Sequence, residues 1–564
     1  MWTCGRVNVQ RGEPATCRFA APGSGEDCTG RYRDTENSRI LIVTDALVIG
    51  LDSSTQSTKA IAWDARGRVV AEGRADIALA NPGLDRYEQE PEDWWTAALT
   101  ALADCTRQFD GARVEGIAIS NQRETLGCIG KDGRAVRPAI IWLDERARDE
   151  VATFSDAFGA ENIHRITGRV PDVIPCLYRF AWIKAHEPDV WRDTACFVDV
   201  QAYLVQRFCG GEFRTGWTSA DPMGIFDMQE RRWSAPILEA LELEESRLPK
   251  TFPPGAQLGE LLPDVAARCG LPAGTPFFAA GGDGQCAGLG TDCTRPERAY
   301  INLGTAIVSG MWSAEYQYDR YWRTEIAAHG EGYILENCLR SGAFLIDWFV
   351  TQFVAHGKAD ESVFARLEKA ALALPVGSDG LLVQPYFSGS MDPHWDSTAR
   401  GVILGLSGSH KEAHIYRAII ESITIDQAMR SDDMEAAAGQ RIEHFVAVGG
   451  GANSPLWRQM LADATGRPVH VSETVEASAL GAGMTAAAGA GWFTSIAAAA
   501  TAMAGATTPV EPDPVRGEAY ASLIEIYRDV YAATASLNTR MGEFAARQRA
   551  GFPAARRTNV ESTT

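Results

Sequence analysis

One carboxylate stands inside a run of glycines near the middle of the 564-residue chain. Asp283 lies between Gly282 and Gly284, directly after the apolar stretch 275–280 and before a glycine-rich helix start. Because glycine has no Cβ, backbone and ligand can approach each other closely there. An acid placed in such a cleft is a candidate general base. We interpret Asp283 as the catalytic base of an enzyme.

Two further turns have the composition of anion-binding loops. An apolar strand at 46–52 ends in Asp52 and runs into the hydroxyl-rich turn 53–58, and a shorter turn at 303–305 lies about 250 residues later. Small residues in such turns expose backbone N–H groups to a phosphate, and a strand-end carboxylate can hold a hydrated Mg2+. Each turn alone is an ordinary strand-end turn. Together with the Asp283 run they require a common explanation.

A charged pair and a tryptophan follow two other strands. Residues 116–120 are predicted to form a buried strand, and Arg123 and Glu124 come shortly after it. A guanidinium beside a carboxylate supplies the donors and acceptors that polyol hydroxyls require, and the alternative is a structural ion pair. Trp142 directly follows the apolar residues 140–141. Its ring can either stack on a sugar face or belong to the core.

Three consecutive glycines mark another strand-to-helix turn. A predicted strand at 445–448 runs into 449–451, and a helix is expected from Pro455. Glycines at this position allow a flat base or a ribose to lie against the backbone. A plain tight turn is the alternative, although it would not need the third glycine.

Composition limits the classes of function. The chain is 45% hydrophobic and 22% charged, as in a soluble globular protein, and its net charge of −20 disfavours nucleic-acid and anionic-membrane partners. No apolar run approaches the roughly 20 residues of a membrane span, and no start typical of secretion is present. The 12 cysteines include no C-x-x-C pair, which indicates neither a zinc site nor a disulfide framework. A reducing cytoplasmic setting is expected.

The length predicts two domains. Residues 1–45 are expected to be a disordered extension, with a folded mini-domain as the alternative. A strand–turn–strand arrangement at 49–62 recurs at 300–309, as expected from two related lobes, which we place at 46–292 and 298–500. An Ala/Gly-rich helix at 478–489 is suited to close packing. The remaining residues, 501–564, are expected to form a long helix from about 515 to 547 and a polar tail.

Two longer patterns carry a resemblance to a known family. Residues 401–421 match, at every constrained position, one signature of the FGGY family of carbohydrate kinases. The second signature is matched imperfectly at 174–186, where Ile174 replaces a small or aromatic residue and Arg179 replaces lysine. The resemblance covers roughly residues 46–535. It implies an α/β, two-lobed, actin-like and ribonuclease-H-like ATPase fold with a nucleotide cleft between the lobes.

The resemblance also implies roles for individual residues. Asp283 would take the proton from the sugar hydroxyl, Asp52 would organise Mg2+, and the N-terminal lobe would bind sugar and phosphates. The acceptor would be held by Arg123, Glu124 and Trp142 as well as Asp283. ATP would be held by Ser54, Thr55, Lys59, Gly304, Thr305, Gly450, Gly451 and Asn453, the last three around adenosine in the C-terminal lobe. Because no G-x-x-x-x-G-K-[ST] occurs, a P-loop kinase is excluded.

The implied partners are ATP and a small sugar, without nucleic acid or membrane, and a homodimer is compatible with the sequence. Segments 140–146 and 384–401 resemble the xylulose-kinase branch of the family, so we expect phosphorylation of a primary hydroxyl, with D-xylulose giving D-xylulose 5-phosphate. Segment 121–125 has the glycerol-kinase form, although Ile174 stands where those enzymes have a substrate-contacting tyrosine. Glycerol or another ketose or polyol is therefore the alternative. A non-catalytic ATP and sugar sensor would have lost Asp283 or Asp52.

Overall fold

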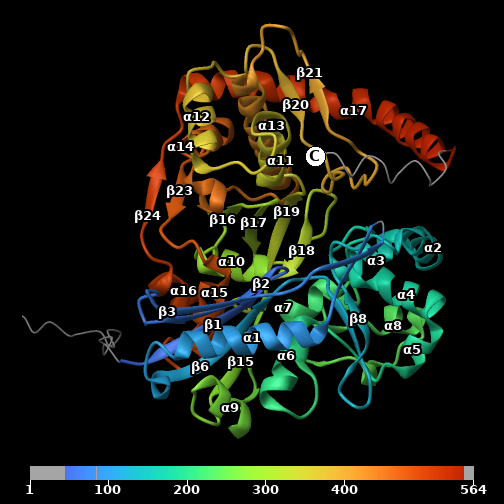
Figure 1. Ribbon diagram of the computed structural model, residues 1–564, viewed down its shortest axis with the longest axis vertical. Helices are drawn as coiled ribbons and strands as arrows, with labels where there is room; N and C mark the ends of the chain where they lie inside the picture. The colour runs from blue at the N-terminus through green and yellow to red at the C-terminus, as the bar shows by residue number, and fades with distance from the viewer. Residues whose placement is uncertain (1–44, 84, 552–564) are drawn as a thin grey trace, which may run out of the picture. The chain divides into compact units, whose positions relative to one another are not determined.

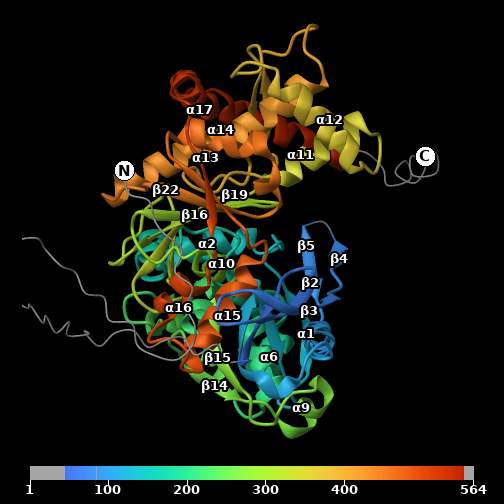
Figure 2. The same ribbon diagram turned by 90° about the vertical axis from the view of Figure 1, so that its left-hand side faces the viewer.

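The computed structural model describes residues 45–83 and 85–551 (Figure 1; Figure 2). The extension predicted for residues 1–45 therefore lies, apart from Asp45, outside the described residues, and so does the end of the polar tail. Strands and helices are mixed along the whole described chain, which agrees with the predicted α/β class. None of the helices formed by these residues is long and apolar enough to cross a membrane.

Within the described residues, a six-stranded sheet with the order β14-β15-β6-β1-β2-β3 forms the framework of the first half. β1, β6 and β15 are parallel, whereas β2 pairs antiparallel with β1 and β3, and β14 pairs antiparallel with β15. The carboxyl ends of the parallel strands meet at one edge, where ligands bind in open α/β sheets. The strands are β1 (Leu47–Ser53), β2 (Ser57–Trp63), β3 (Val69–Asp76), β6 (Val114–Asn121), β14 (Gln257–Glu260) and β15 (Pro276–Gly282).

The second half repeats this arrangement in a sheet of seven described strands, with the order β18-β19-β17-β16-β22-β23-β24. β17 is antiparallel to β16 and β19, and β22 is parallel to β16 and β23, just as β2 and β6 are placed around β1. The predicted strand–turn–strand repeat is thereby confirmed. The strands are β16 (Arg298–Leu303), β17 (Ile307–Ser313), β18 (Arg323–Ile326), β19 (Tyr333–Leu339), β22 (His444–Val448), β23 (Val469–Ser472) and β24 (Thr507–Val510).

Helices cover both faces of the first sheet, which explains the continuous apolar runs of its strands. Leu47, Ile49 and Leu51 on β1 pack into a core with α1 (Pro91–Thr106) and α6 (Val200–Cys209). Val48, on the opposite face, packs with α15 (Ala477–Gly489) and α16 (Ile496–Met503). Figure 2 shows α15 beside β15, and α16 packs against α15, so a helix from late in the sequence covers the first sheet.

Small residues set the distance between α15 and its neighbours. A Cβ at Gly50 on β1 would lie 1.9 Å from the carbonyl oxygen of Ala479, and a Cβ at Gly481 would lie 2.0 Å from that of Cys286. Gly50 and Gly481 therefore allow α15 to approach β1 and the short helix α10 (Asp283–Gly290) at backbone contact. The close packing predicted from the Ala/Gly-rich sequence is confirmed.

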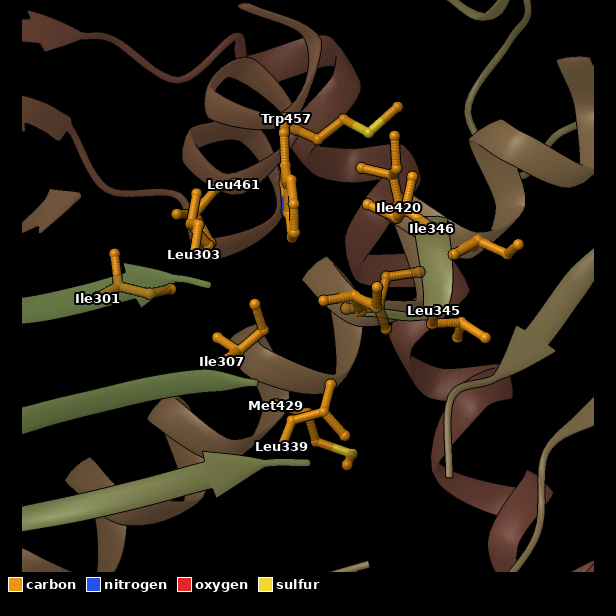
Figure 3. Packing of buried hydrophobic residues seen from close by; sticks show 14 of the residues in the cluster. Ile301, Leu303, Ile307, Leu339, Leu345, Ile346, Ile420, Met429, Trp457 and Leu461 are labelled. Atoms are coloured by element: carbon orange, nitrogen blue, oxygen red, sulfur yellow. The ribbon is translucent and has the colours of Figure 1, made fainter. Parts of the chain in front are cut away.

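Figure 3 shows the core of the second half, where sheet residues meet side chains from several helices. Ile301, Leu303, Ile307 and Leu339 extend from the sheet toward Trp457 and the helices around it. These helices are α11 (Ala343–Phe349), α12 (Glu361–Leu372), α13 (Glu412–Ala438), α14 (Pro455–Thr465) and α17 (Pro514–Gly551). The last is the predicted C-terminal helix, and it begins one residue earlier and ends four residues later than expected.

A third sheet consists of five described strands in the order β4-β5-β8-β7-β9, two from before β6 and three from after it. Its strands are β4 (Ala80–Gly83), β5 (Arg86–Gln89), β7 (Leu126–Ile129), β8 (Ala135–Ile140) and β9 (Cys196–Val198). The helices that pack beside this sheet are α2 (Arg148–Phe158), α3 (Ala160–Thr167), α4 (Cys176–His186), α5 (Pro188–Asp193) and α8 (Ala235–Leu241). By contrast, α7 (Trp217–Ala220) packs against β15 of the first sheet, and α9 (Pro263–Cys269) packs against α1. Two-stranded sheets are formed by β10 (Arg214–Gly216) with β13 (Lys250–Phe252), by β11 (Phe226–Asp227) with β12 (Arg232–Trp233), and by β20 (Leu382–Gln384) with β21 (Val402–Leu404).

Candidate active site

A cavity of about 190 Å³ is lined by residues from both large sheets and from α10 and α15. Four residues predicted for the site, Asp52, Ser54, Arg123 and Asp283, line it together although they come from separate parts of the first half. The other lining residues are Gly284, Ala287, Tyr300, Asn302, Val308 and Ser478. The cavity thus lies where the strand ends of the first sheet meet β16 and β17 of the second sheet.

Asp283 begins α10, directly after the end of β15, and its side chain is 40% exposed. Its Oδ1 accepts a hydrogen bond from the Gly284 backbone N–H at 2.8 Å and lies 3.1 Å from the Arg123 Nε. Desolvation raises the pKa of the Asp283 carboxyl, and the Arg123 guanidinium opposes this. An accessible carboxylate in a fixed orientation, with a raised pKa, has the properties of a general base.

Asp52 lies near the end of β1, where Ser120 from β6 donates a hydrogen bond to its Oδ1 at 2.8 Å. The pKa of Asp52 is raised to about 7: burial is the largest cause and the negative charge of Asp283 adds to it, whereas the hydrogen bond from Ser120 opposes the rise. Two carboxylates on one cavity repel each other, and a dication between them would relieve that repulsion.

The donor set suits Mg2+, although no cluster of three or more acidic, His or Cys residues among those described forms a ready-made metal site. Mg2+ prefers oxygen ligands and is commonly held by one or two carboxylates together with the phosphates of a substrate. Asp52 and Asp283 supply such carboxylates.

Arg123 follows β6 and is buried, with its side chain 7% exposed. Besides Asp283, its guanidinium contacts two carboxylates from the second sheet: Nη1 donates to Glu336 Oε1 at 3.0 Å and to Glu325. Gly282 provides the space, because a Cβ there would lie 2.4 Å from the Arg123 Cδ. The glycine beside the candidate base is therefore explained by the arginine that packs against it.

Glu124, the neighbour of Arg123, lies in a buried charge cluster instead of the cavity lining. Its Oε1 accepts from Arg169 Nη1 at 3.2 Å and from Arg323 Nη1 at 3.3 Å, and it is 5% exposed. Its backbone φ of 47° sends it away from the direction of a regular strand. Glu124 thus belongs to a charge cluster that joins the two large sheets and consists of Arg123, Glu124, Arg169, Asp221, Arg323, Glu325 and Glu336.

Trp142, Thr55 and Lys59 lie outside the lining of the cavity. The Trp142 indole N–H donates to the Thr55 Oγ1 at 2.9 Å, so the tryptophan supports the turn between β1 and β2. Lys59, on β2, pairs through its Nζ with Glu476 Oε1 at 2.5 Å, just before α15. Ser54, which does line the cavity, donates across the same turn to the Ser57 carbonyl at 2.9 Å.

The glycine-rich turns of the second half lie at strand ends of its sheet. Gly304 and Thr305 connect β16 to β17, and their carbonyls accept hydrogen bonds from Ala343 and Gly342 at the start of α11. Gly450, Gly451 and Asn453 form a short 3₁₀ turn after β22. None of these five residues lines the cavity formed by the described residues.

Packing accounts for two of the three consecutive glycines. Gly449 has a φ of 85°, and a Cβ there would lie 2.3 Å from the Asn302 Oδ1. A Cβ at Gly451 would lie 2.6 Å from the Trp457 ring. At Gly450, by contrast, no described atom lies within 4 Å of the Cβ position. Gly450 is thus the glycine of the three whose Cβ position is open among the described residues.

Sequence reasoning missed several residues at the cavity. Ser478 donates to the Asp283 carbonyl at 3.0 Å and so fixes the start of α10 from α15. Asn302 and Tyr300 come from β16. The repeat contained a signal for Asn302, because it stands near the end of β16 as Asp52 stands near the end of β1. Glu325 and Glu336 had no comparable local signal.

Comparisons with known proteins agree with this architecture. The N-terminal domain of the FGGY family of carbohydrate kinases matches residues 47–290, and its C-terminal domain matches residues 299–490. The chain is 30% identical to the xylulose kinase of Bacillus subtilis over 502 residues, covering 88% of this chain and 99% of that protein. It is 24% identical to the gluconokinase of the same organism over 441 residues, covering 77% and 86%.

A solved structure similar to this chain is that of a xylulose kinase from Rhodospirillum rubrum. Its TM-score is 0.80 at 27% identity, and the match covers 87% of this chain and 100% of that one. The two-lobed actin-like ATPase fold implied by the sequence is thereby confirmed. With both domains matched in order across most of its length, the chain belongs to the FGGY family of carbohydrate kinases and is a phosphotransferase that acts on an alcohol group.

Proposed function

We propose that this carbohydrate kinase transfers the terminal phosphoryl group of Mg-ATP to a primary hydroxyl of a small sugar, with D-xylulose as its acceptor and D-xylulose 5-phosphate as its product. The convergence of Asp283, Arg123 and Asp52 on one cavity carries the proposal of phosphoryl transfer. The similarity to a xylulose kinase along 99% of that protein's length supports D-xylulose as the acceptor.

Asp283 has the role of base in this proposal. It takes the proton of the acceptor hydroxyl, which contributes roughly 10²–10⁴ to the rate of a positioned reaction. Arg123 Nε and the Gly284 N–H both contact Oδ1 of this carboxylate, and Ser478 anchors the first turn of α10. Alignment of this kind matters because phosphoryl transfer relies on positioning and charge stabilisation more than on covalent chemistry.

We assign the nucleotide to strand-end turns of the two large sheets, and among their residues Ser54 lines the cavity. Ser54, Thr55 and Lys59 provide the first phosphate turn, Gly304 and Thr305 the second, and Gly450, Gly451 and Asn453 the adenosine surface. Asp52 is the residue that would hold Mg2+, which would supply positive charge to stabilise the phosphate groups during transfer. Asp52 itself supplies a carboxylate that Ser120 orients.

Glycerol is the second candidate acceptor, because segment 121–125 has the glycerol-kinase form. The environment of Ile174 does not favour it. Ile174 is 6% exposed and packs in an apolar cluster with Val173, Cys338 and Met391. At position 174, where glycerol kinases have a tyrosine, this chain therefore has no hydroxyl group that could contact the acceptor. Trp142 and Glu124 are proposed to act on the acceptor indirectly, through the first turn and the charge cluster.

The test is ADP release from Mg-ATP with D-xylulose, L-xylulose, D-ribulose, L-ribulose, glycerol, erythritol and xylitol as acceptors. We expect D-xylulose to give the highest kcat/KM. Preference for glycerol would show that segment 121–125 outweighs Ile174. If none of these acceptors is phosphorylated while ATP still binds, the proposed acceptor is wrong.

A further inference from the structure

Among the described residues that line the cavity, Arg123 is the cation, and Asp52 and Asp283 are the acids. A kinase acting on a sugar acid needs a cation that is free to pair with the acceptor carboxylate, because charge-assisted hydrogen bonds are the strong ones. Whether Arg123 can serve in this way depends on the groups that already hold its guanidinium.

The Arg123 charge is already matched by carboxylates. Nε lies 3.1 Å from Asp283 Oδ1, and Nη1 donates to Glu336 Oε1 at 3.0 Å and to Glu325. Glu325 and Glu336 are both completely buried. An anionic acceptor would therefore meet a guanidinium whose charge is already paired with carboxylates through Nε and Nη1, on a cavity that also carries two acids.

Glu336 is the carboxylate that supplies this charge from the second sheet. Its Oε1 accepts from Arg323 Nε at 2.6 Å as well as from Arg123, and its Oε2 accepts from the Tyr300 hydroxyl. Burial alone would raise its pKa, but Arg123 and Arg323 lower the pKa of Glu336 to about 2. Burial raises the pKa of Glu325 to about 8, and its Oε2 has no hydrogen-bond partner among the described residues.

The backbone of α10 leaves space for this contact. A Cβ at position 284 would lie 2.7 Å from both Arg123 Nη2 and Glu336 Oε2. Any side chain there would force the arginine or the glutamate to move. Gly284, next to the base, is thus part of the arrangement that keeps Glu336 on Arg123.

We propose that Glu336 makes the acceptor pocket reject anionic sugars, so that the substrates are uncharged ketoses and polyols and not sugar acids. This inference rests on the proposed function, because it assigns the acceptor to the cavity beside Arg123. Glu336 is thus a specificity-determining residue that acts through the charge of Arg123.

The experiment measures binding calorimetrically with a matched pair of ligands, D-glucitol and D-gluconate, which differ by a hydroxymethyl group and a carboxylate at one end. In the unaltered protein we expect D-gluconate to bind at least about tenfold more weakly than D-glucitol. Glu336→Gln keeps the size and an acceptor oxygen but removes the charge. It should raise the affinity for D-gluconate relative to D-glucitol on the order of tenfold to a hundredfold.

Tyr300→Phe is the matched control, because it removes a hydrogen bond to Glu336 and leaves the charge. We expect it to leave the gluconate-to-glucitol ratio unchanged, whatever it does to the rate. An equal shift in both variants, or no gain of D-gluconate binding in Glu336→Gln, would overturn the inference. If Glu336→Gln does not fold, the unaltered protein decides: equal affinity for the two ligands overturns the proposal, and weaker binding of D-gluconate supports it.

These readouts are separate from the test of the proposed function, because they measure binding without turnover. Failure to phosphorylate D-xylulose would contradict the proposed acceptor and leave the charge discrimination measurable. Conversely, phosphorylation of both D-xylulose and D-gluconate with similar kcat/KM would agree with a sugar kinase and overturn the role given to Glu336.

Discussion

Two buried groups of arginine and carboxylate side chains show how the same residue types serve different ends. The charge cluster meets the cavity through Arg123, whose partner Asp283 has a side chain that is 40% exposed. The second group surrounds Arg430 on α13, which pairs with Asp392 at 2.6 Å and with Asp426. In that group Arg430 and both aspartates are at most 1% exposed.

The difference lies in the carboxylate that remains accessible. Tyr386 and Tyr527 both donate to Asp426 Oδ1, at 2.8 and 2.9 Å, and the Cys338 N–H donates to Asp392, so the Arg430 group is closed on itself. In the charge cluster, the buried Glu325 and Glu336 fix Arg123. The arginine in turn holds Asp283, which remains accessible to a ligand. A buried ion pair alone is weak evidence for function or for stability. An accessible acid held by such a pair is a candidate for chemistry.

The largest expected effect comes from removing the accessible acid. Asp283→Asn keeps the shape of the side chain and an oxygen for the Gly284 N–H, but it cannot take a proton. We expect kcat to fall by roughly 10²–10⁴ while ATP binding and the midpoint of thermal unfolding change little. ADP release, nucleotide titration and thermal unfolding measure the three quantities. Activity within tenfold of the unaltered protein would show that Asp283 is not the base.

For the Arg430 group we expect the opposite result, a loss of stability without a loss of kcat. Arg430→Met leaves Asp392 and Asp426 buried without their cation, which destabilises a protein by about 3–5 kcal/mol. We expect a clearly lower midpoint of thermal unfolding and, for the molecules that remain folded, an unchanged kcat. This loss concerns stability, whereas the loss in Asp283→Asn concerns only the reaction.

Arg528→Met provides the matched control for Arg430→Met. Arg528 pairs with Asp433 on the surface, with its side chain 43% exposed. Exposed pairs contribute little, so we expect a change within about 0.5 kcal/mol. Equal destabilisation by the two substitutions would contradict the view that burial makes Arg430 important.

The sequence was informative where chemistry sits at the end of a strand. Asp52, Ser54, Arg123 and Asp283 were all predicted from their places after apolar strands, and parallel pairing brings them to one edge of the sheet. Local pattern was sufficient here because the sheet order determines which strand ends are neighbours. The repeated topology of the second sheet was predictable for the same reason.

The sequence was less informative about which side chain of an adjacent pair reaches the ligand. Arg123 and Glu124 are neighbours, yet one lines the cavity and the other is buried between Arg169 and Arg323. The positive φ of Glu124 and its two partners decide this, and the partners lie 45 and 199 residues away in the chain. Contacts at such separations leave no local pattern, which is also why Glu336 was not predicted.

A buried carboxylate that has no arginine partner shows, by comparison, what the arginines contribute to the stability of the charge cluster and of the Arg430 group. Asp199, at the start of α6, is 3% exposed and accepts from the Ala202 N–H at 2.9 Å, and no ion pair among the described residues includes it. Burial raises its pKa to about 6. Since an unfolded aspartate has a pKa near 3.9, the folded state binds more protons between about pH 4 and 6. The contribution of Asp199 to stability therefore falls as the pH rises through that window.

Asp199→Asn removes this penalty, because the amide oxygen can still cap the helix and cannot ionise. At pH 7.5 we expect the variant to be more stable than the unaltered protein by about 1–3 kcal/mol, and near pH 4 the advantage should vanish. The difference in thermal midpoint, measured at several pH values, checks this.

Asp360→Asn is the control of opposite sign: Asp360 is an exposed helix cap whose pKa is lowered by the hydrogen bonds that it accepts from Ser362 and Val363. Its substitution should give no gain at pH 7.5. If Asp199→Asn raises stability equally at pH 4 and pH 7.5, the cost of burying the Asp199 charge is not the cause of the gain. This fold would then tolerate a buried carboxylate that has no arginine partner.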